Sequence, residues 1–243
     1  MIFDDGAFPI WKDWEVNTGF DDGVFPLGGG VYVPPPVPPP VPPNGHDPII
    51  IWVSKAGNDT TGTGSQTNPY LTIERALLDM SSGDQIRILD GVYTPTYSIV
   101  VSGIEGSIFA ENPGSVSIRP LNITVHQAAV AVLNSPRFYI FGINIIQSNE
   151  DSDNLVGLYV DNVQTFIAYT CAVSDFESVS GSIKGIFANA QEGRIENCFI
   201  DNIVCSGYEL TGIESYGLDI IDCHVKRLKG NNNCIVKGIK INS

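Results

Sequence analysis

The stretch "RIENCFIDNI", residues 194 to 203, places Cys198 after an asparagine and before alternating apolar residues. Three roles are open to this cysteine: a metal ligand, a disulfide partner, or a small apolar filler of a protein core. The chain has five cysteines, an odd number, and none of them forms a C-x-x-C pair. That pattern argues against both a disulfide framework and a zinc site. The spacing of the cysteines favours the third role.

The sequence repeats around its cysteines. Cys171, Cys198 and Cys223 are 27 and then 25 residues apart, and Ile143 fills the same place 28 residues before Cys171. A β-branched residue follows each cysteine by two positions, and a short polar residue precedes each by one. These residues are Val173, Ile200 and Val225, and Thr170, Asn197 and Asp222. A unit of this length fits three short strands, but it cannot bury its apolar face alone, so the units must stack.

A second column of residues accompanies the first. A glycine followed by an aliphatic residue recurs at intervals of 28, 27 and 26 residues, at Gly157, Gly185, Gly212 and Gly238. The two columns together predict a parallel β-helix of about seven coils, with equivalent residues stacked about 4.8 Å apart. The polar residues before the cysteines then lie in tight bends that short side chains tolerate. The inward core ladder consists of Ile143, Cys171, Cys198 and Cys223.

The segment "WVSKAGNDTTGTGSQTNPYLTIERALLDMSSGDQIRILDGVYT", Trp52 to Thr94, resembles the opening of right-handed parallel β-helix proteins of the pectate-lyase-like superfamily. Its "GD-x-I" element, at Gly83, Asp84 and Ile86, corresponds to the start of the first coil in that family. Thr72 is the expected N-cap of a short helix whose apolar stripe is Ile73, Ala76, Leu77 and Met80. The resemblance implies an all-β domain over residues 49–243, a right-handed parallel β-helix capped by that helix.

Residues 1–33 contain a repeat, "FDDGAFP" at 3–9 and "FDDGVFP" at 20–26. Such a segment is either a disordered tail or an arm that becomes ordered only against a partner. We expect an extended arm that attaches the protein to a larger assembly, because aromatic side chains bury a large area on docking. The expected anchors are Phe3, Phe8, Trp11, Trp14, Phe20 and Phe25.

Residues 34–48 form a polyproline linker, since eight of the ten residues from Pro34 to Pro43 are proline. Polyproline II geometry makes this segment a stiff rod of roughly 30 Å, at ~3.1 Å per residue. An SH3-type ligand is the alternative, although no arginine or lysine flanks the prolines. The favoured interpretation is a spacer that holds the β-helix away from the partner of the arm.

Composition excludes several classes of function. The chain has 27 Asp and Glu against 13 Lys and Arg, a formal charge of −14, which disfavours nucleic acid and anionic lipid as partners. No apolar run is long enough to insert into a membrane, and the acidic amino terminus lacks the features of a signal peptide. The loop "GNDTTGTG", residues 57–64, has one carboxylate, which is few for calcium. We expect no metal and no cofactor.

The carboxylates of the coils are scattered. Asp175 with Asp201, and Glu196 with Asp222, fall in neighbouring coils and are the candidates for catalysis, because glycoside hydrolases use paired carboxylates. Such pairs also arise on a solvated outer face. No lyase or hydrolase fingerprint occurs, so the sequence leaves open whether the protein is an enzyme.

An arm, a stiff linker and a β-helix follow one another as in phage tail spikes and head decorations, which need no secretion signal. The resemblance therefore favours a structural or adhesive bacteriophage virion protein, a homotrimer that contacts other virion proteins through residues 1–33 and a host glycan through its coils. One alternative is a depolymerase, lyase or hydrolase, of host polysaccharide. Another is a carbohydrate-binding protein of a bacterium. The final segment "NNNCIVKGIKINS" has no capping element, so either more protein follows or a partner covers it.

Overall fold

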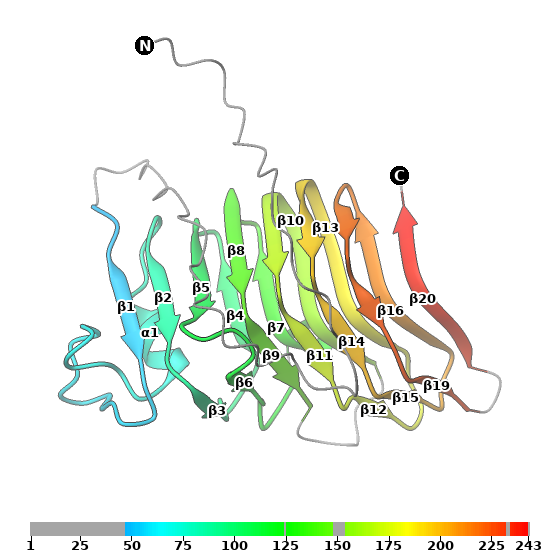
Figure 1. Ribbon diagram of the computed structural model, residues 1–243, viewed down its shortest axis with the longest axis horizontal. Coiled ribbons are helices and arrows are strands. Elements are labelled where there is room, and N and C mark those ends of the chain that lie inside the picture. The colour runs from blue at the N-terminus through cyan, green and yellow to red at the C-terminus, as the bar shows by residue number, and fades with distance from the viewer. Residues whose placement is uncertain (1–46, 124, 148–153, 232–233, 243) are drawn as a thin grey trace, which may run out of the picture. The chain divides into compact units, whose positions relative to one another are not determined.

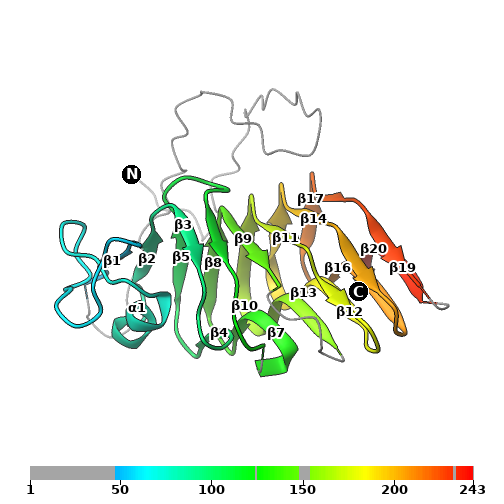
Figure 2. The same ribbon diagram turned by 90° about the horizontal axis from the view of Figure 1, so that it is seen from below.

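The structure, a computed structural model, describes residues 47–123, 125–147, 154–231 and 234–242. The arm (residues 1–33), its six aromatic anchors and the linker up to residue 46 lie outside the described residues, so their roles stay predictions. The described part is almost entirely β-structure, with strands that follow one another as rungs from β1 to β20 (Figures 1 and 2). None of the described helices is long and apolar enough to cross a membrane.

The strands pair in parallel and form three long ladders plus a short one. The first ladder contains β1 (Ile50–Val53), β2 (Gln85–Ile88), β5 (Gly106–Ala110), β8 (Arg137–Phe141), the second halves of β10 (Leu155–Tyr169) and β13 (Ile183–Glu196), and β17 (Asp219–Ile221). The second contains β4 (Ile99–Ser102), β7 (Ala128–Leu133), the first halves of β10 and β13, β16 (Glu209–Tyr216) and β20 (Ile235–Asn242).

The third ladder closes each coil on its remaining side. It contains β3 (Gly91–Tyr93), β6 (Val116–Ile118), β9 (Ile143–Ile146), β11 (Ala172–Ser174), β14 (Phe199–Asp201) and β18 (His224–Val225). The short ladder contains β12 (Glu177–Ser178), β15 (Ile203–Cys205) and β19 (Leu228–Gly230). The predicted parallel β-helix is confirmed.

The number of coils is lower than the sequence predicts. The sequence predicts about seven coils, and the structure has about five turns. Part of the difference arises at the amino-terminal end, where the chain leaves β1 and does not return to the first ladder until β2. A loop and the helix α1 (Ile73–Asp79) occupy the residues between these strands instead of a regular coil.

The cysteine column lies inside the tube, as predicted. Strand register aligns Ile143, Cys171, Cys198 and Cys223 across four coils, below Val116 of the preceding coil. Cys171 and Cys198 are fully buried, and Cys223 is half-buried in the last coil. All five cysteines are free thiols. The structure therefore gives Cys198 the third of its three possible roles, a filler of the core.

The glycine column marks a place where neighbouring backbones come close. A side chain on Gly185 would meet the carbonyl oxygen of Gly212 at 2.5 Å and Ile200 at 2.7 Å, so only glycine fits. The bends before the cysteines are also confirmed, because Thr170, Asn197 and Asp222 all have a positive φ near 50°. Together these two columns fix where each coil turns.

The amino-terminal end of the tube is capped. Thr72 is the N-cap of α1, and its hydroxyl oxygen accepts a hydrogen bond from the backbone N–H of Arg75. Ile73 and Ala76 are fully buried beneath the helix, and Met80 is nearly so. The free edge of β1 is also covered, since Trp52 accepts a hydrogen bond from Tyr70 and donates one to Gly64. No comparable element covers the last coil among the described residues.

Candidate functional site

The first predicted pair of carboxylates, Asp175 and Asp201, bonds to other side chains of the tube. Asp201 makes two bonds to the guanidinium of Arg227 in the next coil, at 2.6 Å from Nε and 2.5 Å from Nη2. Hydrogen bonding from Arg227 holds the pKa of Asp201 below its usual value. Asp175 accepts a hydrogen bond from Asn202 Nδ2 at 2.6 Å and another from Ser174 Oγ at 2.9 Å. Both carboxylates therefore link or brace neighbouring coils.

The second predicted pair lies in a different bend. Glu196 forms an ion pair with Arg194 at 2.7 Å, and Asp222 sits in the left-handed bend of the next coil with its side chain exposed. Asn197, beside Glu196, precedes strand β14, and Asp201 is the last residue of that strand, so the two places are roughly 13 Å apart at about 3.3 Å per residue. The structure thus does not gather the four predicted carboxylates into one site.

The single carboxylate of the loop 57–64 has a structural role. Asp59 accepts hydrogen bonds from the backbone N–H groups of Leu71 and Thr72, at 2.8 and 3.0 Å, and from the Thr72 hydroxyl at 2.7 Å. These bonds tie the loop to the start of α1. In the described part of the chain, no three His, Cys, Asp or Glu side chains are grouped to hold a metal ion.

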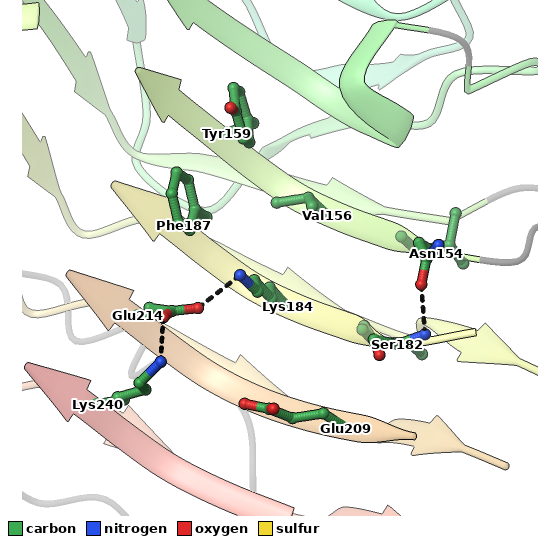
Figure 3. A pocket seen from close by; sticks show the side chains of 11 residues that line it. Asn154, Val156, Tyr159, Ser182, Lys184, Phe187, Glu209, Glu214 and Lys240 are labelled. Atoms are coloured by element: carbon green, nitrogen blue, oxygen red, sulfur yellow. Dashed lines mark hydrogen bonds and ion pairs between the residues drawn. The ribbon is translucent and has the colours of Figure 1, made fainter. Parts of the chain in front are cut away.

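A groove of about 520 Å³ crosses the outer face of the second ladder, over β10, β13, β16 and β20 (Figure 3). Glu214 is one of its lining residues, with a side chain only 3% exposed. Lys184 Nζ approaches it at 2.6 Å from the coil before, and Lys240 bonds to it from the coil after. Tyr216 donates a further hydrogen bond at 3.1 Å. A buried carboxylate is thereby held between two lysines.

The pKa of Glu214 reflects both its burial and its partners. Burial alone would raise this pKa, but the hydrogen bonds from Lys184 and Lys240 outweigh it and lower the pKa to about 2. Sequence patterns alone did not point to Glu214. They could have done so, because Glu214 and Lys240 hold equivalent places in neighbouring coils. Tyr159, Phe187, Glu214 and Lys240 each follow by two positions a glycine of the column Gly157, Gly185, Gly212 and Gly238.

Aromatic rings line the other end of this groove. His126, Tyr159 and Phe187 stack in succession, with ring centroids 4.7 and 5.0 Å apart and planes inclined by 9° and 13°. Lys184 Nζ lies 4.6 Å from the centroid of the Phe187 ring. The flat faces of Tyr159 are therefore covered by neighbouring rings, and the groove presents ring edges and paired charges to a ligand.

A second groove, also of about 520 Å³, follows the outer face of the first ladder. Its lining residues are nearly all polar: Glu105, Pro136, Arg137, Gln164, Thr165, Gln191 and Glu192. Arg137 lies 3.4 Å from Glu105, and the Thr165 hydroxyl donates to Glu192 at 2.7 Å.

Register places Glu105 and Glu192 three coils apart, roughly 14 Å at about 4.8 Å per coil. That separation exceeds the ~6.5–9.5 Å of an inverting glycosidase pair. The second groove therefore offers hydrogen-bonding groups spaced along the tube rather than a pair of catalytic carboxylates.

No family model and no curated protein match the chain. Solved structures do match. They include a rhamnogalacturonan lyase, 12% identical with a TM-score of 0.45, over 78% of this chain and 62% of that one. They also include the pectate lyase Pel9A, 12% identical with a TM-score of 0.46, over 70% and 54%. A third is the pectin methylesterase PemA from Erwinia chrysanthemi, 15% identical with a TM-score of 0.42, over 70% and 66%.

The likeness is one of fold. With TM-scores below 0.5, it adds nothing to the parallel β-helix that the strand ladders themselves establish. The chain spans between 54% and 66% of the length of the three proteins it is compared with. At 12–15% identity the likeness concerns the path of the backbone and carries no reaction over to this chain.

Proposed function

We propose that this protein is a structural and adhesive component of a bacteriophage virion. Its arm attaches it to other virion proteins, and its β-helix displays a surface that binds a host glycan without cleaving it. The proposal that the protein does not cleave the glycan rests on the contacts of the predicted carboxylates. Asp175, Asp201 and Glu196 bond to other side chains, and Glu196 and Asp201 end different strands, β13 and β14.

The order of the segments supports the virion part of the proposal. An aromatic, acidic arm without a core of its own, a stiff polyproline rod and a β-helix suit an appendage that is fixed at one end and exposed at the other. Spikes of this kind are homotrimers in the family that the sequence resembles, and we propose the same assembly here, located in the virion.

The groove of the first ladder is the proposed glycan contact. Gln164 and Gln191 are exposed and stand in neighbouring coils beside Arg137 and Thr165. Two exposed amides suit a ligand rich in hydroxyl groups. The groove around Glu214 is less suitable, because its charges already pair with each other.

Particle assembly tests the role of the arm. Deleting residues 1–33 should leave the β-helix folded, with an unchanged circular dichroism spectrum, and remove the protein from assembled particles. Replacing Phe8 and Phe25 by alanine should reduce incorporation more than Glu177→Gln, which changes an exposed residue of the coils. Full incorporation of the truncated protein would refute the anchoring role.

Glycan assays test the adhesive role against the enzymatic alternative. The intact protein should bind purified host polysaccharide, and Gln164→Ala with Gln191→Ala should weaken that binding while Glu177→Gln leaves it unchanged. No new reducing ends and no unsaturated uronates should form. If cleavage occurs and is lost in Asp175→Asn or Asp201→Asn, the protein is a depolymerase and the adhesive proposal fails.

A further inference from the structure

The groove of the first ladder follows one column of polar side chains along the tube. Strand register aligns Arg137, Thr165 and Glu192 in three successive coils, and Glu105 takes the same place in the coil before them. All four residues line the groove. At about 4.8 Å per coil the column is roughly 14 Å long. That length exceeds one sugar ring, so an oligosaccharide or a polymer can lie along it.

Arg137 is the one cation among the described residues that line this groove, and its charge is already paired. It lies 3.4 Å from Glu105 and two coils, roughly 10 Å, from Glu192. Glu192 accepts a hydrogen bond from the Thr165 hydroxyl at 2.7 Å, but that hydroxyl carries no charge. Two glutamates and one arginine give the lining residues a formal charge of −1. The surplus negative charge therefore lies at Glu192.

The uncharged hydrogen-bonding groups of the groove are its two amides. Gln164 and Gln191 are exposed and stand in neighbouring coils, about 4.8 Å apart. An amide both donates and accepts hydrogen bonds, and so does the hydroxyl group of a sugar. An ionised carboxylate only accepts, so it could use the donor half of each amide and would leave the acceptor half without a partner.

We propose that this groove binds uncharged glycans and discriminates against glycans that carry carboxylates. The inference rests on the proposed function, because it names the class of glycan that the same groove takes. A neutral sugar offers hydroxyl donors to Glu192 and to the amide oxygens of Gln164 and Gln191. A uronate instead places a second negative charge near Glu192, where no free cation compensates it, and like charges lower the affinity.

Matched pairs of immobilised oligosaccharides are the probes. Each pair holds a neutral chain of glucose, mannose or galactose units and the same chain with its C6 hydroxymethyl groups oxidised to carboxylates. Surface plasmon resonance with the full-length protein should show binding to at least one neutral chain. Its oxidised partner should bind at least about tenfold more weakly at low salt, and high salt should narrow the difference because it screens the charges.

Two glutamate variants locate the source of the discrimination. Glu192→Gln removes the surplus charge and leaves the pair of Arg137 and Glu105 intact, so the oxidised chain should bind within about threefold of the neutral one. Glu177→Gln removes a carboxylate that is exposed on β12, outside the groove, and should leave the discrimination unchanged. Glu192 is also exposed, so both variants should fold, and equal melting temperatures check this.

The outcomes separate this inference from the proposed function. The inference is overturned if the oxidised chain of a pair binds as tightly as the neutral one, or if Glu192→Gln keeps the discrimination of the wild type. In both cases the protein still binds a glycan, and the adhesive role stands. Binding to no neutral chain also overturns the inference. The adhesive role falls with it only if the purified host polysaccharide is not bound either.

Discussion

Cys198 lies in the middle of a column of thiols that runs along the axis of the tube. Its Sγ contacts the carbonyl oxygen of Ala168 at 3.8 Å, and Cys223 Sγ contacts that of Ile195 at 3.3 Å, so the pattern repeats from coil to coil. Burial raises the pKa of Cys198 well above its usual value, which keeps it a neutral thiol. A small polarizable side chain suits this site because the coils on both sides are already close-packed.

A charge at Cys198 should therefore unfold the domain. Cys198→Asp buries a carboxylate with no cation in reach, which costs several kcal/mol. Cys223→Asp should cost much less, because Cys223 is only half-buried. Thermal melts of both variants, beside Cys198→Ala, measure the difference. Equal melting temperatures for Cys198→Asp and the wild type would contradict the inward column.

Glu214 should make the stability of the domain depend on pH. Its folded pKa of about 2 lies below the ordinary glutamate value of 4.5. The stabilisation by the ionised form is complete above pH 4.5 and is lost as the pH falls toward 2. The shift corresponds to about 3 kcal/mol. Urea unfolding between pH 6 and 2 should show this loss, and Glu214→Gln should remove most of it. Glu177→Gln is the control, and an identical pH profile for Glu214→Gln would refute the assignment.

At the scale of the structural element, the sequence is most informative about the bends between strands. Asn197 and Asp222 were identifiable as bend residues because each directly precedes a cysteine that recurs at intervals of 27 and 25 residues. The second bend, at Asp175, Asn202 and Arg227, also has positive φ values, between 46° and 60°. It escapes the sequence analysis because an arginine in a left-handed bend follows no general preference. Its guanidinium compensates by binding Asp201 of the coil before.

The cap helix gives a prediction at the same scale. Thr72 both caps α1 and donates to Asp59, so Thr72→Ala removes two hydrogen bonds at the amino-terminal end. The expected cost is about 1 kcal/mol, a fall in melting temperature of about 2–4 °C for a domain of this size. Thr72→Ser keeps the hydroxyl and should melt close to the wild type. A loss of equal size in Thr72→Ser would show that the methyl group, and not the cap, matters.

For the molecule as a whole, periodicity predicted the fold far better than the site. A repeat is visible in one sequence because every coil must present the same apolar column to the interior. The two grooves are not visible in this way. Arg137, Thr165 and Glu192 keep the spacing of the core, each six residues before Ile143, Cys171 and Cys198, but an outward column carries a different residue type in every coil. The capping segment before β2 contributes to the overestimated coil count, because it is as long as a coil but does not form one.

The described coils should be unequally stable along the tube. Each inner coil is stabilised mainly by its two neighbours, whereas β20 has one strand partner, β16, among the described residues. Backbone amides of β20 should therefore exchange with deuterium faster than those of β16, and those of β16 faster than those of β13. Hydrogen exchange measured by mass spectrometry on the full-length protein gives this order directly. A uniform protection pattern from β13 to β20 would contradict it.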